Sequence, residues 1–168
     1  MPEGKGVNVN IDFKDVWSAV HDVGDWVASE ATTKLVDNAF MIPKGVSSPN
    51  ELSGWEGEPH HIWQSYEWEG HTSDTRIHYG IVWYYGASVE GRGRYIGNAD
   101  IYFAVDEIGF LEKFRVDASF NNPMTIGNGV AQMSGGLSIG YYEYGSLSKS
   151  LQYQFIIRGD GAGNLWRT

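Results

Sequence analysis

The stretch KFRVDASF, residues 113–120, decides the fold class of this 168-residue chain. Apolar and polar residues alternate along it without interruption. The apolar set is Phe114, Val116, Ala118 and Phe120, and the polar set is Lys113, Arg115, Asp117 and Ser119. Because successive side chains of a β-strand point to opposite faces, this alternation predicts a strand with one buried face and one solvent-exposed face.

The same period of two extends to both sides of this stretch. It recurs in residues 99–105 and 151–155, and three further segments, 60–68, 75–85 and 137–144, are rich in the aromatic and β-branched residues that favour strands. Glycine-bearing turns separate these segments and no helical pattern lies between them, which excludes a parallel βαβ sheet. The sequence therefore predicts a mainly β domain of about seven or eight antiparallel strands, arranged as a barrel or as a sandwich.

The N-terminal region shows a different spacing. From residue 12 onward the apolar residues recur three and four positions apart, as on one face of an amphipathic helix. They are Phe13, Val16, Trp17, Val20, Val23, Val27, Ala28, Ala31 and Leu35. Asp12 stands at the start of the pattern, where it would cap a helix N-terminus. We therefore expect one N-terminal amphipathic helix over about residues 12–38, with its apolar face on the sheet.

The rest of the chain completes a single domain. Residues 44–59 are rich in Gly, Pro and Ser and show no period, so we expect a loop or a lid there, followed by antiparallel sheet over residues 60–168. The whole chain, 1–168, is long enough to bury one core. It has no cysteine, and its histidines show no spacing that places two ligands on one face, so we expect no metal site and no cofactor.

The formal net charge of −9 bears on the choice of partners. A strongly acidic chain is repelled by phosphate backbones, so we expect no nucleic-acid partner. No apolar run approaches the roughly 18 residues of a spanning helix, so we expect no integral membrane segment. The first residues lack the basic and apolar regions of a secretory signal, which favours a cytoplasmic location. A homo-oligomer is compatible with this composition.

The segment DTRIHYGIVWYY, residues 74–85, differs from the other expected strands because neither face is simply apolar. One face carries Arg76, His78 and Tyr84, and the other is aliphatic and aromatic. Such a strand fits a barrel wall whose outside is covered by the helix and whose inside lines a cavity. A buried Arg76 would need an anionic partner, such as a ligand carboxylate. The alternative is the opposite orientation, with Arg76 on the surface.

Part of this strand resembles a known family. DTRIHYGIV, residues 74–82, is similar to the Asp-x-Arg-Ile-His-x-Gly-x-Val stretch of the phenolic acid decarboxylases, and YEWEG, residues 66–70, resembles that family's upstream Tyr-Glu-Asn-Gly strand. The resemblance implies a calycin-like β-barrel that removes CO2 from hydroxycinnamates without a cofactor. It also implies that Arg76 binds the substrate carboxylate, that Tyr66 helps to hold it, and that Glu107 acts as a proton relay.

Two functions from different classes follow. The first is a barrel that encloses an apolar or aromatic small molecule, including one with a carboxylate, and whose chemistry, if it is an enzyme, is that of a cofactor-free lyase, isomerase or cyclase. Its candidate catalytic residues are Arg76, Tyr66 and Glu107, and its candidate ligand contacts are His78, Tyr84, Trp68 and Gln64. The alternative is a non-enzymatic binder of glycans or lipid headgroups, lectin-like or cytolysin-like, because Tyr and Trp rings have apolar faces and polar rims. An enclosed pocket at Arg76, His78 and Tyr84 favours the first function, and these side chains on an outer face favour the second.

Overall fold

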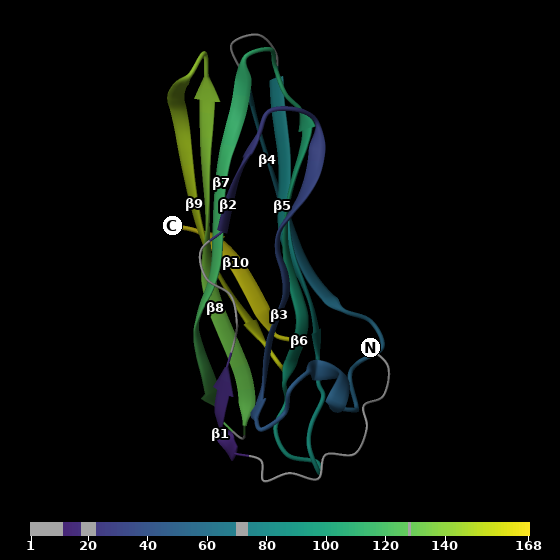
Figure 1. Cartoon of the computed structure of the whole chain (residues 1–168). Helices are drawn as coiled ribbons and strands as arrows, with labels where there is room; N and C mark the ends of the chain where they lie inside the picture. Colours follow the sequence, from purple (N-terminus) through teal and green to yellow (C-terminus); the bar gives the residue numbers. More distant parts are fainter. Residues whose placement is uncertain (1–11, 18–22, 70–73, 128) are drawn as a thin grey trace.

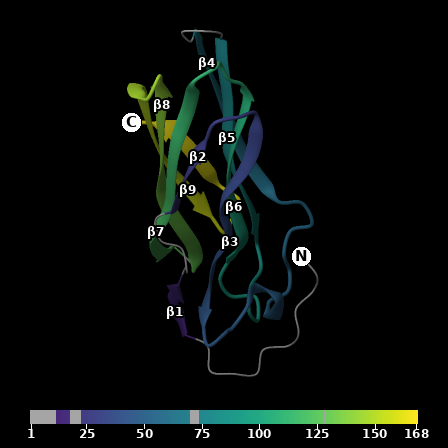
Figure 2. The same ribbon diagram turned by 45° about the horizontal axis from the view of Figure 1, so that its top comes forward.

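Two antiparallel sheets make up the described part of the chain. The computed structural model describes residues 12–17, 23–69, 74–127 and 129–168. Its elements are β1 (Asp12–Trp17), β2 (Val23–Val27), β3 (Ala31–Lys44), the 3-10 helix η1 (Pro49–Glu51), β4 (His60–Glu69), β5 (Asp74–Tyr85), β6 (Ile96–Glu107), β7 (Glu112–Ile126), β8 (Val130–Glu143), β9 (Ser146–Arg158) and β10 (Gly163–Arg167). The first sheet has the strand order β1-β3-β6-β5-β4 and the second β10-β9-β8-β7-β2, with antiparallel neighbours throughout. In Figures 1 and 2 the two sheets lie face to face as two layers.

This arrangement confirms the predicted mainly β, antiparallel fold. The segments expected as strands at 60–68, 75–85 and 137–144 lie in β4, β5 and β8. The described residues contain ten strands instead of seven or eight, because the N-terminal region adds three. An isolated bridge between Arg94 and Val130 links the chain just before β6 to β8. Within these ranges no helix has the length and apolar character needed to cross a membrane.

The helix predicted for residues 12–38 is wrong. The described part of this region forms β1, β2 and the beginning of β3, while residues 18–22 lie outside the described residues. Its strands find partners far away in the sequence, since β2 pairs with β7 and β3 with β6. Three register shifts interrupt the pairing of β3, so its buried residues Val36, Ala39 and Met41 do not follow a period of two. Bulged spacing of this kind resembles a helical pattern, although the valines and threonines of the region favour strands.

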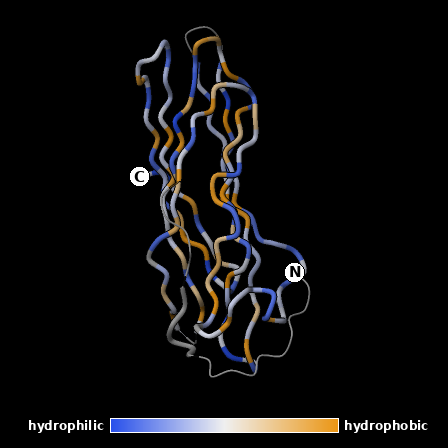
Figure 3. The backbone as a smooth tube through the Cα atoms, in the orientation of Figure 1, coloured by the Kyte–Doolittle hydropathy of each residue, from blue (hydrophilic) through white to orange (hydrophobic). Residues whose placement is uncertain are grey.

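The core lies between the two sheets, and both contribute large side chains to it. The largest of these are Trp83, Tyr79, Tyr95, Tyr141, Phe103, Phe114 and Phe155. The ring centroids of Phe103 in the first sheet and Phe114 in the second lie 5.5 Å apart. The Tyr79 hydroxyl donates a hydrogen bond to the Tyr153 hydroxyl, again from sheet to sheet, at 2.5 Å. Figure 3 shows how hydrophobic and hydrophilic positions alternate along the strands. Burial of aromatic surface therefore holds the two layers together.

The connection expected at residues 44–59 is anchored on this core. It begins at Lys44, the last residue of β3, contains η1 and leads into β4. Val46 and Leu52 are buried in the core cluster. The Trp55 indole Nε1 donates to the Pro49 carbonyl at 3.2 Å, which ties the end of the connection to η1. The connection is therefore a packed part of the domain.

Candidate ligand-binding site

The residues predicted from the sequence separate into two groups on opposite faces of the first sheet. Arg76, His78, Tyr84 and Glu107 lie on the outer face, and Gln64, Tyr66 and Trp68 lie on the inner face. The backbone of the sheet lies between the groups, so one ligand cannot contact both. The structure therefore does not bring Arg76 and Tyr66 together around a shared substrate.

The inward orientation expected for Arg76 and His78 is wrong. The alternate residues of β5, among them Tyr79, Ile81 and Trp83, fill the core instead. That face buries far more apolar surface, which decides the orientation of the strand. Alternation alone identifies two faces and does not say which of them is buried.

On the outer face Arg76 lies between two carboxylates. Its Nε is 3.4 Å from Glu67 Oε2 and its Nη2 is 3.4 Å from Glu107 Oε1. Glu107 reaches this position because the β5–β6 pairing shifts register between Arg76 and Ile77, and such a bulge redirects side chains. Glu107 thus serves as a counter-ion of Arg76 on the exposed face.

His78 also has an acidic partner on the outer face. Asp106 contacts His78 Nε2, and Ser65 Oγ lies 2.5 Å from His78 Nδ1. These three side chains form a row across β4, β5 and β6. Cross-strand rows of this kind stabilise the register of a sheet.

The inner group takes part in packing between the sheets. Gln64 Nε2 donates to the Leu165 carbonyl at 2.6 Å, and the Trp68 ring packs edge-on against aromatic rings of the second sheet. The Tyr66 ring centroid lies 5.2 Å from Lys149 Nζ. Hydrogen bonding to this ammonium group lowers the pKa of Tyr66. Gln64 and Trp68 therefore connect the edges of the two layers.

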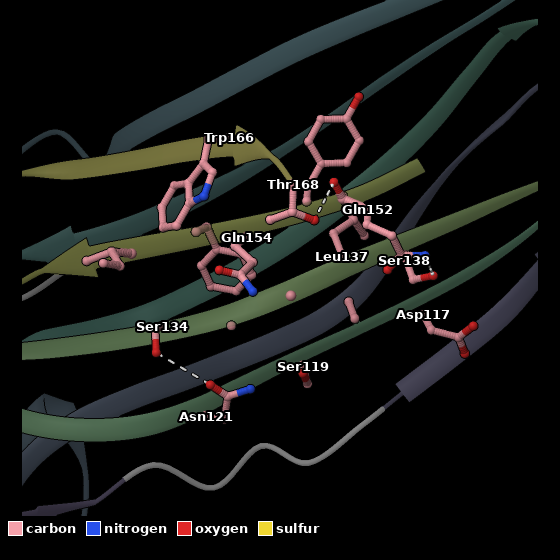
Figure 4. Close-up of a pocket in the computed structure, with 16 residues that line it drawn as sticks. Asp117, Ser119, Asn121, Ser134, Leu137, Ser138, Gln152, Gln154, Trp166 and Thr168 are labelled. Atoms are coloured by element: carbon pink, nitrogen blue, oxygen red, sulfur yellow. Dashed lines mark hydrogen bonds between the residues drawn. The ribbon is translucent and has the colours of Figure 1, made fainter. Parts of the chain in front are cut away.

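A groove of about 730 Å³ crosses the outer face of the second sheet (Figure 4). Its central row follows the strand pairing: Trp166 of β10 is opposite Gln154 of β9, Gln154 is opposite Gly136 of β8, and Gly136 is opposite Ser119 of β7. A Cβ built on Gly136 would meet only the Tyr153 carbonyl oxygen, at 3.7 Å. The floor of the groove is therefore open because the residue at its centre has no side chain.

Polar side chains flank this central row on both sides. Gln152, Ser138 and Asp117 lie on one side, and Ser134 and Asn121 lie on the other. Gln152 Nε2 donates to Ser138 Oγ at 2.8 Å, and Ser134 Oγ donates to Asn121 Oδ1 at 3.4 Å. Figure 4 shows these side chains along neighbouring strands, with Trp166 at one margin. Hydroxyl and amide groups thus surround an open floor beside one indole ring.

The groove is nearly uncharged. Among the described residues that line it, Asp117 carries the only charged side chain, and Arg115 Nη2 lies 3.0 Å from Asp117 Oδ1. The remaining polar groups are amides and hydroxyls, which both donate and accept hydrogen bonds. Such a surface suits a neutral ligand that is rich in hydroxyl groups.

This site was not predicted from the sequence, although the sequence contains one signal for it. Residues 134–138 and 152–154 carry uncharged polar residues or glycine at alternate positions, in a chain of which 20% is charged. Residues 134–136 were interpreted as a glycine-bearing turn, whereas they lie inside β8, and Gln152 and Gln154 were interpreted only as the exposed side of a strand. Trp166 gave no signal, because nothing in its local sequence places it beside Gln154.

Comparisons with known proteins identified no relative of this chain. The chain matches no protein family, no curated protein and no solved structure. The choice of function therefore depends on the geometry of the groove.

Proposed function

We propose that the protein is a non-enzymatic glycan-binding protein and that the groove on the outer face of the second sheet holds a neutral oligosaccharide. The observation that carries this proposal is the central row across four strands, Trp166, Gln154, Gly136 and Ser119, in which Gly136 leaves its backbone bare between Gln154 and Ser119. The two facing sheets also favour a sandwich over a closed barrel.

The chemistry of the row matches that of a sugar. Sugar hydroxyls donate and accept hydrogen bonds, as do the amide of Gln154 and the hydroxyl of Ser119. The partly exposed Trp166 offers an apolar ring face on which the C–H face of a sugar ring can stack, with a polar rim beside it. The volume of about 730 Å³ falls within the roughly 300–1,000 Å³ typical of small-ligand sites.

The other hypotheses fit the described residues less well. An enclosed ligand would need space between the sheets, where a continuous cluster of buried side chains lies. Arg76 and His78 lie on the outer face, which favours a surface-binding role. A lipid phosphate would need a cationic partner, and the described lining of the groove has none. A neutral glycan is therefore the ligand class with the best chemical match.

A glycan microarray followed by calorimetry on the sugars that bind tests the proposal. Trp166→Ala should weaken the affinity at least tenfold by removing the stacking surface. Gly136→Val should also abolish binding, because its side chain would fill the floor without displacing the neighbouring strands. Trp63→Ala is the matched control, since Trp63 is also exposed but lies on the outer face of the first sheet.

Two results would contradict the proposal. One is the absence of any bound neutral glycan on the array. The other is a sugar whose affinity is unchanged in both Trp166→Ala and Gly136→Val, since that sugar would bind elsewhere on the protein.

A further inference from the structure

Large apolar side chains are exposed together at one end of the molecule. Phe110 and Leu111 lie in the β6–β7 connection, Tyr144 lies in the β8–β9 turn, and Leu147 is the second residue of β9. Their exposed fractions are 77%, 54%, 53% and 56%. A backbone hydrogen bond from Tyr144 N to Leu111 O, 3.1 Å long, joins the two connections. These four residues are called the apolar tip, and both connections lie at the upper end of Figure 1.

The backbone holds the apolar tip in a defined shape. Leu111 and Tyr144 have φ angles of 65° and 53°, in the left-handed region that bulky residues rarely adopt. The buried Glu112 braces the connection, because its Oε2 accepts hydrogen bonds from Gly109 N at 2.6 Å and from Thr75 Oγ1 at 2.8 Å. The backbone conformation and the hydrogen bonds of Glu112 therefore hold Phe110 and Leu111 in exposed positions.

Aromatic and cationic side chains lie next to the apolar tip. Trp26 is 47% exposed, its ring centroid is 5.1 Å from that of Tyr142, and Lys113 Nζ lies 4.5 Å from the Trp26 ring centroid. Lys113 follows Phe110 by three residues and pairs with Tyr142 across β7 and β8. Trp26, Lys113 and Tyr142 are called the collar.

From this juxtaposition we infer that the apolar tip inserts into the surface of a zwitterionic phospholipid bilayer. Phe110 and Leu111 would enter the acyl region, and the collar would lie at the level of the headgroups. Trp and Tyr rings favour that interface, and a lysine there keeps its ammonium group near lipid phosphates. A net charge of −9 opposes binding to an anionic membrane, so the favoured surface is zwitterionic.

Size and shape favour a membrane over a protein partner. Four side chains exposed to this extent present on the order of 400 Å². A standard protein interface buries about 800 Å² on each partner. The apolar tip is also confined to one end of the second sheet, at the β6–β7 and β8–β9 connections, so it does not form a broad face. This inference is independent of the glycan groove, which lies farther along the second sheet.

Flotation of the full chain with phosphatidylcholine vesicles tests the inference. The wild type should float with the vesicles, and Phe110→Asp should lower the partition coefficient at least tenfold. Leu147→Ser provides a second variant with an expected loss in the same direction. Trp63→Ala, an exposed tryptophan of the other sheet, should bind like the wild type. Equal thermal midpoints would show that the variants are folded.

Quenching by brominated lipids gives an independent measurement. Quenching of tryptophan fluorescence should fall in Trp26→Phe, because Trp26 belongs to the collar and would lie closest to the lipid. The inference is overturned if the wild type does not float with phosphatidylcholine, or if it floats only with phosphatidylserine. Self-association that Phe110→Asp abolishes, without vesicle binding, would assign the apolar tip to a second copy of the chain and overturn it equally.

Discussion

Gly135 and Gly136 are neighbours in β8, yet a Cβ on Gly135 would collide with the Ser119 carbonyl and the Phe155 ring, whereas a Cβ on Gly136 would make only an ordinary contact with the Tyr153 carbonyl. We therefore expect Gly135→Ala to lower the free energy of unfolding by about 1–3 kcal/mol, the usual cost of overpacking a core. Gly136→Ala should leave it unchanged or raise it by about 0.5 kcal/mol, since alanine loses less entropy in a strand. Urea denaturation measures both values. Equal losses in the two variants would show that the two positions do not differ in this way.

The hydroxyl pair of Tyr79 and Tyr153 predicts a coupled pair of mutations. Burial raises the pKa of Tyr79, so its hydroxyl stays protonated and donates to Tyr153 at 2.5 Å. Tyr79→Phe and Tyr153→Phe should each cost about 1 kcal/mol, because each leaves a buried hydroxyl without its partner. The double variant should cost clearly less than the sum. A double-mutant cycle by chemical denaturation measures the coupling, and strict additivity would mean that the two hydroxyls do not depend on each other.

Thr75 and Arg76 are adjacent, but substitutions at the two positions should differ in effect. The buried Thr75 donates to Glu112 Oε2 at 2.8 Å, so Thr75→Val removes a hydrogen bond to a buried carboxylate and should cost about 1.5–3 kcal/mol. Arg76 forms exposed ion pairs, so Arg76→Met should change stability by less than about 1 kcal/mol. Thermal and urea unfolding compare the variants. A larger loss for Arg76→Met than for Thr75→Val would contradict the assignment of inner and outer faces.

Asp100 predicts a pH-dependent stability difference. Burial raises the pKa of its carboxyl, although Asn38 N donates to Oδ1 at 2.9 Å and opposes the shift. A carboxyl whose folded pKa is raised contributes its full stability below its ordinary pKa, and that contribution is lost as the pH rises through the folded value. Asp100→Asn removes the ionisation and keeps an oxygen for the Asn38 hydrogen bond. The variant should therefore be more stable than the wild type at pH 7 and equal to it at pH 3.

Unfolding curves of both proteins at several pH values measure this difference. Lys34→Gln is a useful control, since Lys34 Nζ lies 3.9 Å from Asp100 Oδ2 and its positive charge favours the ionised carboxyl. Removing that charge from the wild type should lower stability at pH 7 and leave it unchanged at pH 3. A gain for Asp100→Asn that persists at pH 3 would mean that its cause is not ionisation.

The strands whose pairing is regular could be predicted from the sequence, and the bulged ones could not. Residues 113–120 pair with β8 without a register shift, so their side chains keep a strict period of two. In β3 three shifts break that period, and the pattern then resembles a helix. The spacing of apolar residues identifies a strand only where the backbone keeps the regular alternation of an ideal strand.

The candidate site could not be predicted for a related reason. The groove depends on which strands are neighbours, since only the β10-β9-β8 order places Trp166 opposite Gln154 and Gln154 opposite Gly136. For β5, the aliphatic and aromatic face packs against the core, so Trp83 points inward and Arg76 outward, which is opposite to the expected barrel wall. The residue types were sufficient to identify polar candidate residues, but they did not show which of these residues lie close together in the structure.

The outer face of the first sheet and the groove of the second sheet differ in how many charged side chains they carry, and dissolved salt should therefore affect them differently. Ion pairs such as Arg76 with Glu67 and Lys34 with Asp37 lie on the first sheet, whereas the groove of the second sheet holds amides and hydroxyls. At physiological ionic strength the field of an exposed charge is screened within about 8 Å. Added electrolyte should weaken the ion pairs of the first sheet, whereas the hydrogen bonds between amides and hydroxyls in the groove should change little.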